Sequence, residues 1–207
     1  AHCQQQVSGR HILSISDTSE INLQSHRGRL KPDGLGVVGN NKDVGFFIHP
    51  TLALDAETGF ALGLSNVQLW TCSRERPDKE ERDRAKLPIE LKESYKWLAS
   101  AERSQRCYQR GDAKIITHIG DREADLYEEW ATVPDRYNHV LVRVHQDRRL
   151  FGQTQSLYTY LSAQPCEGTY SVQVMADPRT GRTAREALLG ICCASVQIQR
   201  PEKLKGE

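Results

Sequence analysis

Two acidic residues that lie far apart in the sequence are the best candidates for chemistry in this chain. Asp17 follows the short β-like run 11–16, and Asp121 follows the run 114–120, Lys-Ile-Ile-Thr-His-Ile-Gly. A carboxylate that ends a strand lies at the rim of a sheet, where open α/β sheets bind ligands. Mg²⁺ prefers hard oxygen ligands and keeps several waters, so a few carboxylates suffice to bind it. The two aspartates therefore predict one shared metal site.

Each aspartate also has a structural explanation when it is considered alone. An Asp followed by Thr-Ser is common in turns, so Asp17 could be a turn or capping residue. Asp121 could be a helix N-cap, with Glu123 and Asp125 as favourable partners of the helix dipole. The pairing favours the metal site, because both residues end strands in an order that a metal-nuclease fold uses.

Composition excludes several classes of protein. The chain has 207 residues with 38% hydrophobic content, which is enough for one sizeable core and a second small module. Its net charge of +1 provides no global basic field for a nucleic-acid partner. None of the six cysteines forms a C-x-x-C pair, which argues against a structural zinc site. No run of about 18 apolar residues occurs, so we expect no membrane partner.

Hydrophobic periodicity predicts the elements that must position the aspartates. Strands are expected at 11–16, 44–54, 60–72, 114–120 and 139–144, and helices at 89–106 and 124–133. The first three strands are separated by loop and turn signals, which indicates an antiparallel meander. The order β-β-β-α-β-α-β predicts an α/β, ribonuclease-H-like core: a mixed sheet in which parallel strands extend the meander and helices flank the faces. The first and fourth strands are neighbours in that fold, which would bring Asp17 and Asp121 together.

The character of the sequence changes after residue 146. Helical periodicity is lost except at 157–161, while 170–175 and 188–199 alternate and the turn signal 177–181 separates them. We therefore expect a partial ribonuclease-H-like catalytic core at 1–146 and a partial, β-rich insertion domain at 147–207. Because the sequence lacks an initiator Met and ends directly after a β-like segment, we expect it to be a piece of a longer protein.

Four separate segments together resemble the DDE transposases of the insertion-sequence-four type, a family that includes the transposase of transposon five. The similar segments are the first-aspartate strand with Asp17-Thr18-Ser19, the helix Lys-Glu-Ser-Tyr-Lys-Trp-Leu-Ala at 92–99, the second-aspartate motif Asp-Arg-Glu-Ala-Asp at 121–125, and the strand Val-Leu-Val-Arg at 140–143. The match runs in order over about residues 11 to 190.

The resemblance implies Mg²⁺-dependent cleavage of double-stranded DNA at transposon ends and strand transfer into a target, with Mn²⁺ as a substitute metal. Asp17 and Asp121 would be the first two members of the metal-binding triad. It also implies a parent enzyme that is dimeric on DNA and lies in the bacterial cytoplasm, associated with the nucleoid.

Three further residues are candidates for DNA binding in this resemblance. Arg122 and Arg143 would lie near the DNA, where we expect phosphate contacts. Tyr127 is a third candidate, because it lies one turn after Glu123 if residues 124–133 continue that turn as a helix.

The sequence departs from the family at the third catalytic residue. In the family this residue is a Glu in the pattern Tyr-x-x-Arg-x-x-x-Glu, which does not occur here; Glu186 lies in the expected insertion and lacks the Tyr. We therefore expect an incomplete triad, and no transposition by these 207 residues alone. Two alternatives remain: a degenerate remnant that at most binds DNA, and a stand-alone metal nuclease. The reading frame downstream of Glu207 tests the first, and a nicking assay with Asp121→Ala tests the second.

Overall fold

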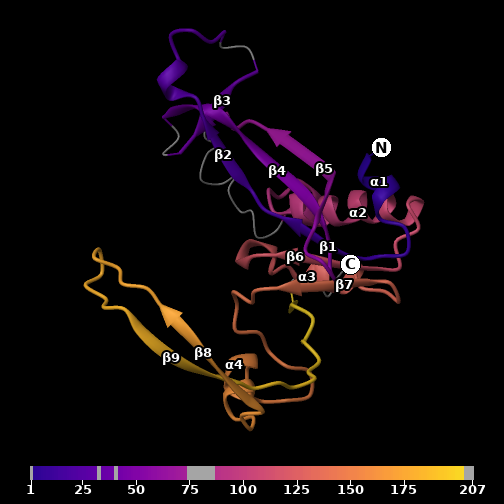
Figure 1. Ribbon diagram of the computed structural model, residues 1–207, viewed down its shortest axis with the longest axis vertical. Helices are drawn as coiled ribbons and strands as arrows, with labels where there is room; N and C mark the ends of the chain where they lie inside the picture. The colour runs from indigo at the N-terminus through magenta and orange to yellow at the C-terminus, as the bar shows by residue number, and fades with distance from the viewer. Residues whose placement is uncertain (1, 32–33, 40–41, 74–86, 203–207) are drawn as a thin grey trace. The chain divides into compact units, whose positions relative to one another are not determined.

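The structure, a computed structural model, describes residues 2–31, 34–39, 42–73 and 87–202. It divides into two compact units, Ala1–His145 and Gln146–Glu207 (Figure 1). The division falls within one residue of the change in character at 146 that the sequence indicates.

The first unit is built around a mixed sheet with α-helices. Its described strands are β1 (His11–Ser16), β2 (Ser19–Asn22), β3 (Gly36–Val38), β4 (Asp43–Asp55), β5 (Ala61–Trp70), β6 (Ile115–Gly120) and β7 (Asn138–Val142). Its described helices are α1 (His2–Gln6), α2 (Tyr95–Arg110) and α3 (Tyr127–Thr132), with 3₁₀ turns η1 (Gln24–His26), η3 (Ile89–Leu91) and η4 (Arg122–Ala124). The chain is thus an α/β protein, as the sequence predicts.

Strand pairing gives the lateral order β5-β4-β1-β6-β7 (Figure 1). The strands β1, β4 and β5 form an antiparallel meander, while β6 runs parallel to β1 and β7 runs parallel to β6. The predicted adjacency of the first and fourth predicted strands is therefore confirmed. The short strands β2 and β3 extend the outer half of β4, and the sequence did not predict them, because Ser-Glu-Ile-Asn is polar and 36–38 lies in a glycine-rich segment.

The helix predicted at 124–133 is wrong in its first turn. The backbone makes the turn η4, leaves helical geometry at Asp125 (ψ 67°) and Leu126 (ψ 127°), and only then enters α3. The physical reason is a tertiary contact: the buried Asp125 carboxylate accepts a hydrogen bond from the backbone N–H of His145 at 2.7 Å. The helix predicted at 89–106 is likewise split, into η3 and α2.

One face of the sheet forms the core of the first unit, and we call it the covered face. Its main cluster joins α1, α2 and the central strands through Cys3, Val7, Ile12, Ala53, Leu62, Tyr108 and Ile116. A second cluster joins α2 and the end of α3 to the sheet through Leu98, Ala101, Val133 and Val140. Both clusters lie on the same side, since Ile12 pairs with Ile116, and Val140 pairs with His118, which is two residues from Ile116 and so lies on the same face of β6.

Glu129 on α3 provides a pH-dependent contribution to stability. Its side chain is buried, its Oε2 has no hydrogen-bond partner among the described residues, and burial raises its pKa to about 7. Because the pKa in the folded state lies above that of the unfolded chain, the stabilisation is complete below about pH 4.5 and is lost as the pH rises to about 7, a change of about 3 kcal/mol.

We expect Glu129→Gln to remove this decline. The measurement is urea unfolding of both proteins between pH 4.5 and 8. The free energy of unfolding of Glu129→Gln relative to the parent should rise across this range. Burial lowers the pKa values of His49 and His118 to about 4, which makes the free energy of unfolding rise with pH. Because both proteins contain these two histidines, this opposing effect cancels in the difference between them. A pH-independent difference would contradict the assignment.

The second unit contains the short helix α4 (Leu157–Ser162) and an antiparallel hairpin of β8 (Gly168–Val174) and β9 (Arg185–Ile191). The predicted strand at 170–175 and the turn at 177–181 are confirmed, since Asp177 and Arg182 form the bridge at the hairpin tip. The strand predicted at 188–199 is wrong beyond Ile191; residues 197–199 instead pair through backbone hydrogen bonds with residues 149–151.

Candidate functional site

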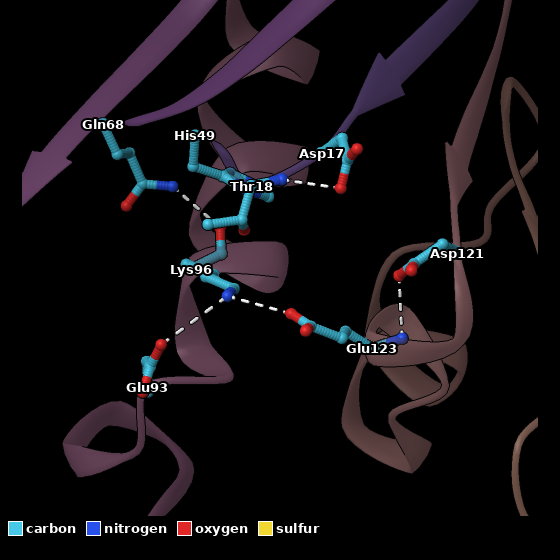
Figure 2. A network of polar contacts seen from close by, with 8 residues as sticks. All are labelled: Asp17, Thr18, His49, Gln68, Glu93, Lys96, Asp121 and Glu123. Carbon is cyan, nitrogen blue, oxygen red and sulfur yellow. Dashed lines mark hydrogen bonds and ion pairs between the residues drawn. The ribbon is translucent and has the colours of Figure 1, made fainter. Parts of the chain in front are cut away.

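The two predicted metal ligands follow neighbouring parallel strands at the same edge of the sheet. The register pairs Ile15 of β1 with Ile119 of β6. Continued by two residues, it aligns Asp17 with Asp121. The sequence prediction that these two aspartates converge is therefore consistent with the strand register, and Figure 2 shows both side chains at this edge.

Arg143 extends the same row by one strand. The register pairs Gly120 of β6 with Val142 of β7, so the next residues, Asp121 and Arg143, are also aligned. Both are exposed. The carboxyl edge of the parallel strands thus carries two acids and one arginine at one level.

Local backbone contacts orient each carboxylate. Asp17 Oδ1 accepts a hydrogen bond from the Thr18 N–H at 2.7 Å, and Asp121 Oδ1 accepts one from the Glu123 N–H at 2.8 Å (Figure 2). The second contact makes Asp121 the N-cap of η4, so its predicted capping role is real. Within the residues that the structure describes, the other oxygen of each carboxylate accepts no hydrogen bond and makes no ion pair. Capping and ligand binding are therefore compatible in Asp121.

A buried lysine lies beside this acidic edge. Lys96, near the start of α2, has a side chain that is only 9% exposed, and its Nζ lies 3.1 Å from Glu123 Oε2 and 3.8 Å from Glu93 Oε1 (Figure 2). The ammonium also lies 5.4 Å from the Trp70 ring centroid, within cation–π distance. The positive charge of Lys96 offsets part of the negative charge that Glu123 and Glu93 bring to this edge.

A neutral histidine lines the same region from β4. His49 is fully buried, its Nδ1 hydrogen-bonds with Thr18 Oγ1 at 2.9 Å, and its ring meets the Trp97 ring edge-on at 4.7 Å between centroids. Burial lowers the pKa of His49 to about 4, assisted by the Lys96 charge and opposed by Asp17 and Glu123. His49 is therefore uncharged at neutral pH, and through Thr18 it supports the backbone next to Asp17.

The remaining predicted site residues lie close to Asp121 in the sequence. Arg122 is exposed in η4, beside Asp121, and Tyr127 is a half-buried residue at the start of α3. The interpretation that Tyr127 lies one helical turn after Glu123 is wrong, because the break at Asp125 and Leu126 separates η4 from α3. A DNA contact for either residue stays a prediction.

Sequence reasoning missed the polar side chains that support the edge. Lys96 belongs to the Lys-Glu-Ser-Tyr-Lys-Trp-Leu segment, so its motif was recognised but its partner Glu123 was not. His49 was hidden inside the apolar strand 44–54. Alternation gave no signal for it, because it assigns His49 to the face opposite the more apolar row of Ile48 and Leu52, whereas the structure buries His49.

Comparison with known proteins adds no family assignment, because a scan against protein-family models finds no match. Among the described residues, no group of three or more His, Cys, Asp or Glu is arranged to hold a metal ion. The helices in this part of the chain also include none that is long and apolar enough to cross a membrane. The candidate site therefore rests on its own geometry: two aligned carboxylates, a buried lysine paired with a third carboxylate, and an arginine at the same edge.

Proposed function

We propose that this chain contributes the catalytic core of a cut-and-paste DNA transposase of the DDE, insertion-sequence-four type. One observation carries the proposal: the register of adjacent parallel strands aligns Asp17 and Asp121 at the carboxyl edge of the sheet. Two carboxylates held in this way are the ligand type that metal-dependent phosphodiester chemistry requires.

The topology supports the proposal. A meander β1-β4-β5, continued on the other side of β1 by the parallel strands β6 and β7, is the strand arrangement expected of a ribonuclease-H-like core. We assign the first unit to that fold. The second unit then takes the place of the β-rich insertion that such transposases carry.

The donor set fits Mg²⁺, or Mn²⁺ in its place. Asp17 and Asp121 offer exposed carboxylate oxygens, which are hard ligands, and the neutral His49 behind them adds no positive charge. When bound, the metal would neutralise charge around the phosphodiester and help to activate the attacking oxygen. Asp17 and Asp121 would hold it.

The third acidic ligand of the family has no counterpart in this site. Glu123 is the carboxylate nearest to the pair along the chain, but the Lys96 ammonium engages it at 3.1 Å. The pattern Tyr-x-x-Arg-x-x-x-Glu is also missing from the sequence. We therefore infer that the chain binds metal weakly and does not carry out strand transfer alone.

The proposal is tested by mapping where a metal binds. Fe²⁺ can replace Mg²⁺ at oxygen sites, and with ascorbate and peroxide it cleaves the polypeptide nearby. We expect cuts next to both Asp17 and Asp121, which excess Mg²⁺ suppresses. Cuts at only one of them, or no cuts, would overturn the shared site. DNA binding without such cuts would support the non-catalytic remnant instead.

Arg143 should contribute a phosphate contact. For Arg143→Ala we expect weaker binding to transposon-end DNA and a plot of log affinity against log salt that is shallower by about one unit, because one phosphate contact is lost. The matched control is Arg110→Ala, which removes an exposed arginine at the end of α2, beside the opposite edge of the sheet. An unchanged affinity and salt slope for Arg143→Ala would count against the contact.

A further inference from the structure

Two series of contacts lead from the first turn of α2 to the two candidate metal ligands. The first begins at Lys96 and ends at Asp121, and the second begins at Trp97 and ends at Asp17. Lys96 and Trp97 are consecutive residues and both are buried, whereas the two aspartates are exposed. One turn of helix inside the first unit is therefore connected to both carboxylates at the edge of the sheet.

The Lys96 series passes through Glu123. The Lys96 ammonium lies 3.1 Å from Glu123 Oε2, and the backbone N–H of the same glutamate donates to Asp121 Oδ1 at 2.8 Å (Figure 2). The ion pair thus holds the residue whose backbone orients the aspartate. Hydrogen bonds of this kind, made by groups behind the ligands, fix the direction in which a metal ligand points.

The Trp97 series passes through His49 and Thr18. The Trp97 ring meets the buried His49 ring edge-on, with 4.7 Å between centroids. His49 Nδ1 hydrogen-bonds with Thr18 Oγ1 at 2.9 Å, and the Thr18 N–H donates to Asp17 Oδ1 at 2.7 Å (Figure 2). Among the described residues, His49 Nε2 has no hydrogen-bond partner, so the contact with Thr18 is the polar contact that orients this ring.

The Trp97 ring also supports the turn that carries Asp121. At Gly120 the backbone leaves no room for a side chain: a Cβ there would lie 3.0 Å from the Trp97 ring and 2.3 Å from the Cβ of Ala124. Ala124 in η4 is fully buried. The turn after β6 is therefore packed directly against the same ring that supports His49.

The first turn of α2 is itself fixed to β5. The Lys96 carbonyl accepts a hydrogen bond from Gln68 Nε2 at 2.8 Å, and the same nitrogen donates to Ser100 Oγ at 2.7 Å. The Lys96 ammonium lies 5.4 Å from the centroid of the Trp70 ring, within cation–π distance. Both series therefore begin at a point that is held by contacts other than those with the aspartates.

We propose that Lys96 and Trp97 are positioning residues that hold the Asp17 and Asp121 carboxylates in place as ligands of one metal ion. This inference rests on the proposed function, because positioning matters for chemistry only if the two aspartates share a metal. It gives Lys96 an effect opposite to that of its charge. An ammonium near a bound cation repels it, so charge alone predicts that removal of Lys96 strengthens metal binding. Loss of positioning weakens metal binding.

The test is Mn²⁺ titration of the full chain with a double-mutant cycle on Lys96 and Glu123. Lys96→Met retains a long apolar side chain in place of the buried stem. We expect about tenfold weaker Mn²⁺ binding in Lys96→Met and in Glu123→Ala, and scarcely any further loss in the double variant, since both interrupt the same series. Lys114→Met removes an exposed lysine at the amino end of β6 and should bind Mn²⁺ as the parent does.

Stronger Mn²⁺ binding in Lys96→Met, or effects of the two substitutions that add, would overturn the proposal in favour of a simple effect of charge. The Trp97 series is tested at Thr18, because replacing the buried tryptophan would disturb the core. Thr18→Val removes the hydroxyl that contacts His49 and should also weaken Mn²⁺ binding. Parental affinity in this variant would exclude Trp97 as a positioning residue.

A measurement without metal separates failure of this inference from failure of the proposed function. In the metal-free chain we expect the Glu123 amide hydrogen to exchange with water faster in Lys96→Met, because its hydrogen bond to Asp121 loses support. The control is the Glu57 amide, which donates to Asp55 Oδ1 at 2.9 Å in a comparable turn and should be unchanged. Unchanged exchange at Glu123 in a chain that binds Mn²⁺ would overturn the positioning role alone, whereas no Mn²⁺ binding by the parent would overturn the proposed function and this role with it.

Discussion

Asp121→Asn is expected to weaken Mn²⁺ binding by about a hundredfold or more, which is the largest effect on function that the structure predicts. The substitution keeps the size of the side chain and an oxygen that can accept the Glu123 N–H, so the N-cap of η4 is preserved. It removes one of the two formal negative charges and one of the two hard oxygen ligands on which metal binding at the proposed site depends. The measurement is Mn²⁺ titration by calorimetry or by paramagnetic relaxation of water.

A matched control separates this effect from a general loss of negative charge. Glu57→Gln removes an exposed carboxylate from the turn between β4 and β5, at the opposite edge of the sheet, and should leave Mn²⁺ affinity unchanged. Asp17→Asn should match Asp121→Asn, and the double variant should bind scarcely less than either single variant. Full affinity in Asp121→Asn, or equal losses in the control, would refute a metal site shared by the two aspartates.

The strands that carry the site were predictable from sequence because their hydrophobic signal is strong and local. β1 begins and ends as predicted, and β6 differs from the predicted strand by one residue. The adjacency of these strands followed from the order of elements, since a meander followed by alternating helices and strands leaves few ways to build one sheet. The placement of Asp17, Asp121 and Arg143 at one edge follows from that order.

The features that could not be predicted from the sequence depend on polar contacts between residues far apart in the chain. The break between η4 and α3 is stabilised by the hydrogen bond from the His145 N–H to Asp125, across 20 positions of the chain. Local propensity favours a continuous helix there, and the tertiary contact prevails. The Lys96–Glu123 ion pair is of the same kind, because it depends on how α2 packs against the turn after β6.

Tyr108→Ala is expected to destabilise the first unit by about 3–5 kcal/mol, the largest effect on stability that the structure predicts. Tyr108 is the largest fully buried side chain among the described residues, and it joins α2 to β1 and β5 within the main core cluster. Its hydroxyl donates to Ser14 Oγ at 3.2 Å or to Ser65 Oγ at 2.9 Å, and burial raises its pKa to about 12, so it stays protonated and can donate at any ordinary pH.

Tyr108→Phe separates the ring from the hydroxyl. The ring still fills the cluster, while Ser14 loses a partner in the buried interior, so we expect a smaller loss of about 1–2 kcal/mol. Urea unfolding of the three proteins, followed by far-ultraviolet circular dichroism, measures both effects. If packing of the Tyr108 ring fastens α2 to the sheet, the free energy of unfolding must decrease in the order parent, Tyr108→Phe, Tyr108→Ala. Equal losses for the two variants would show that the hydroxyl network, and not the packing of the ring, holds α2 and its Lys96 in place.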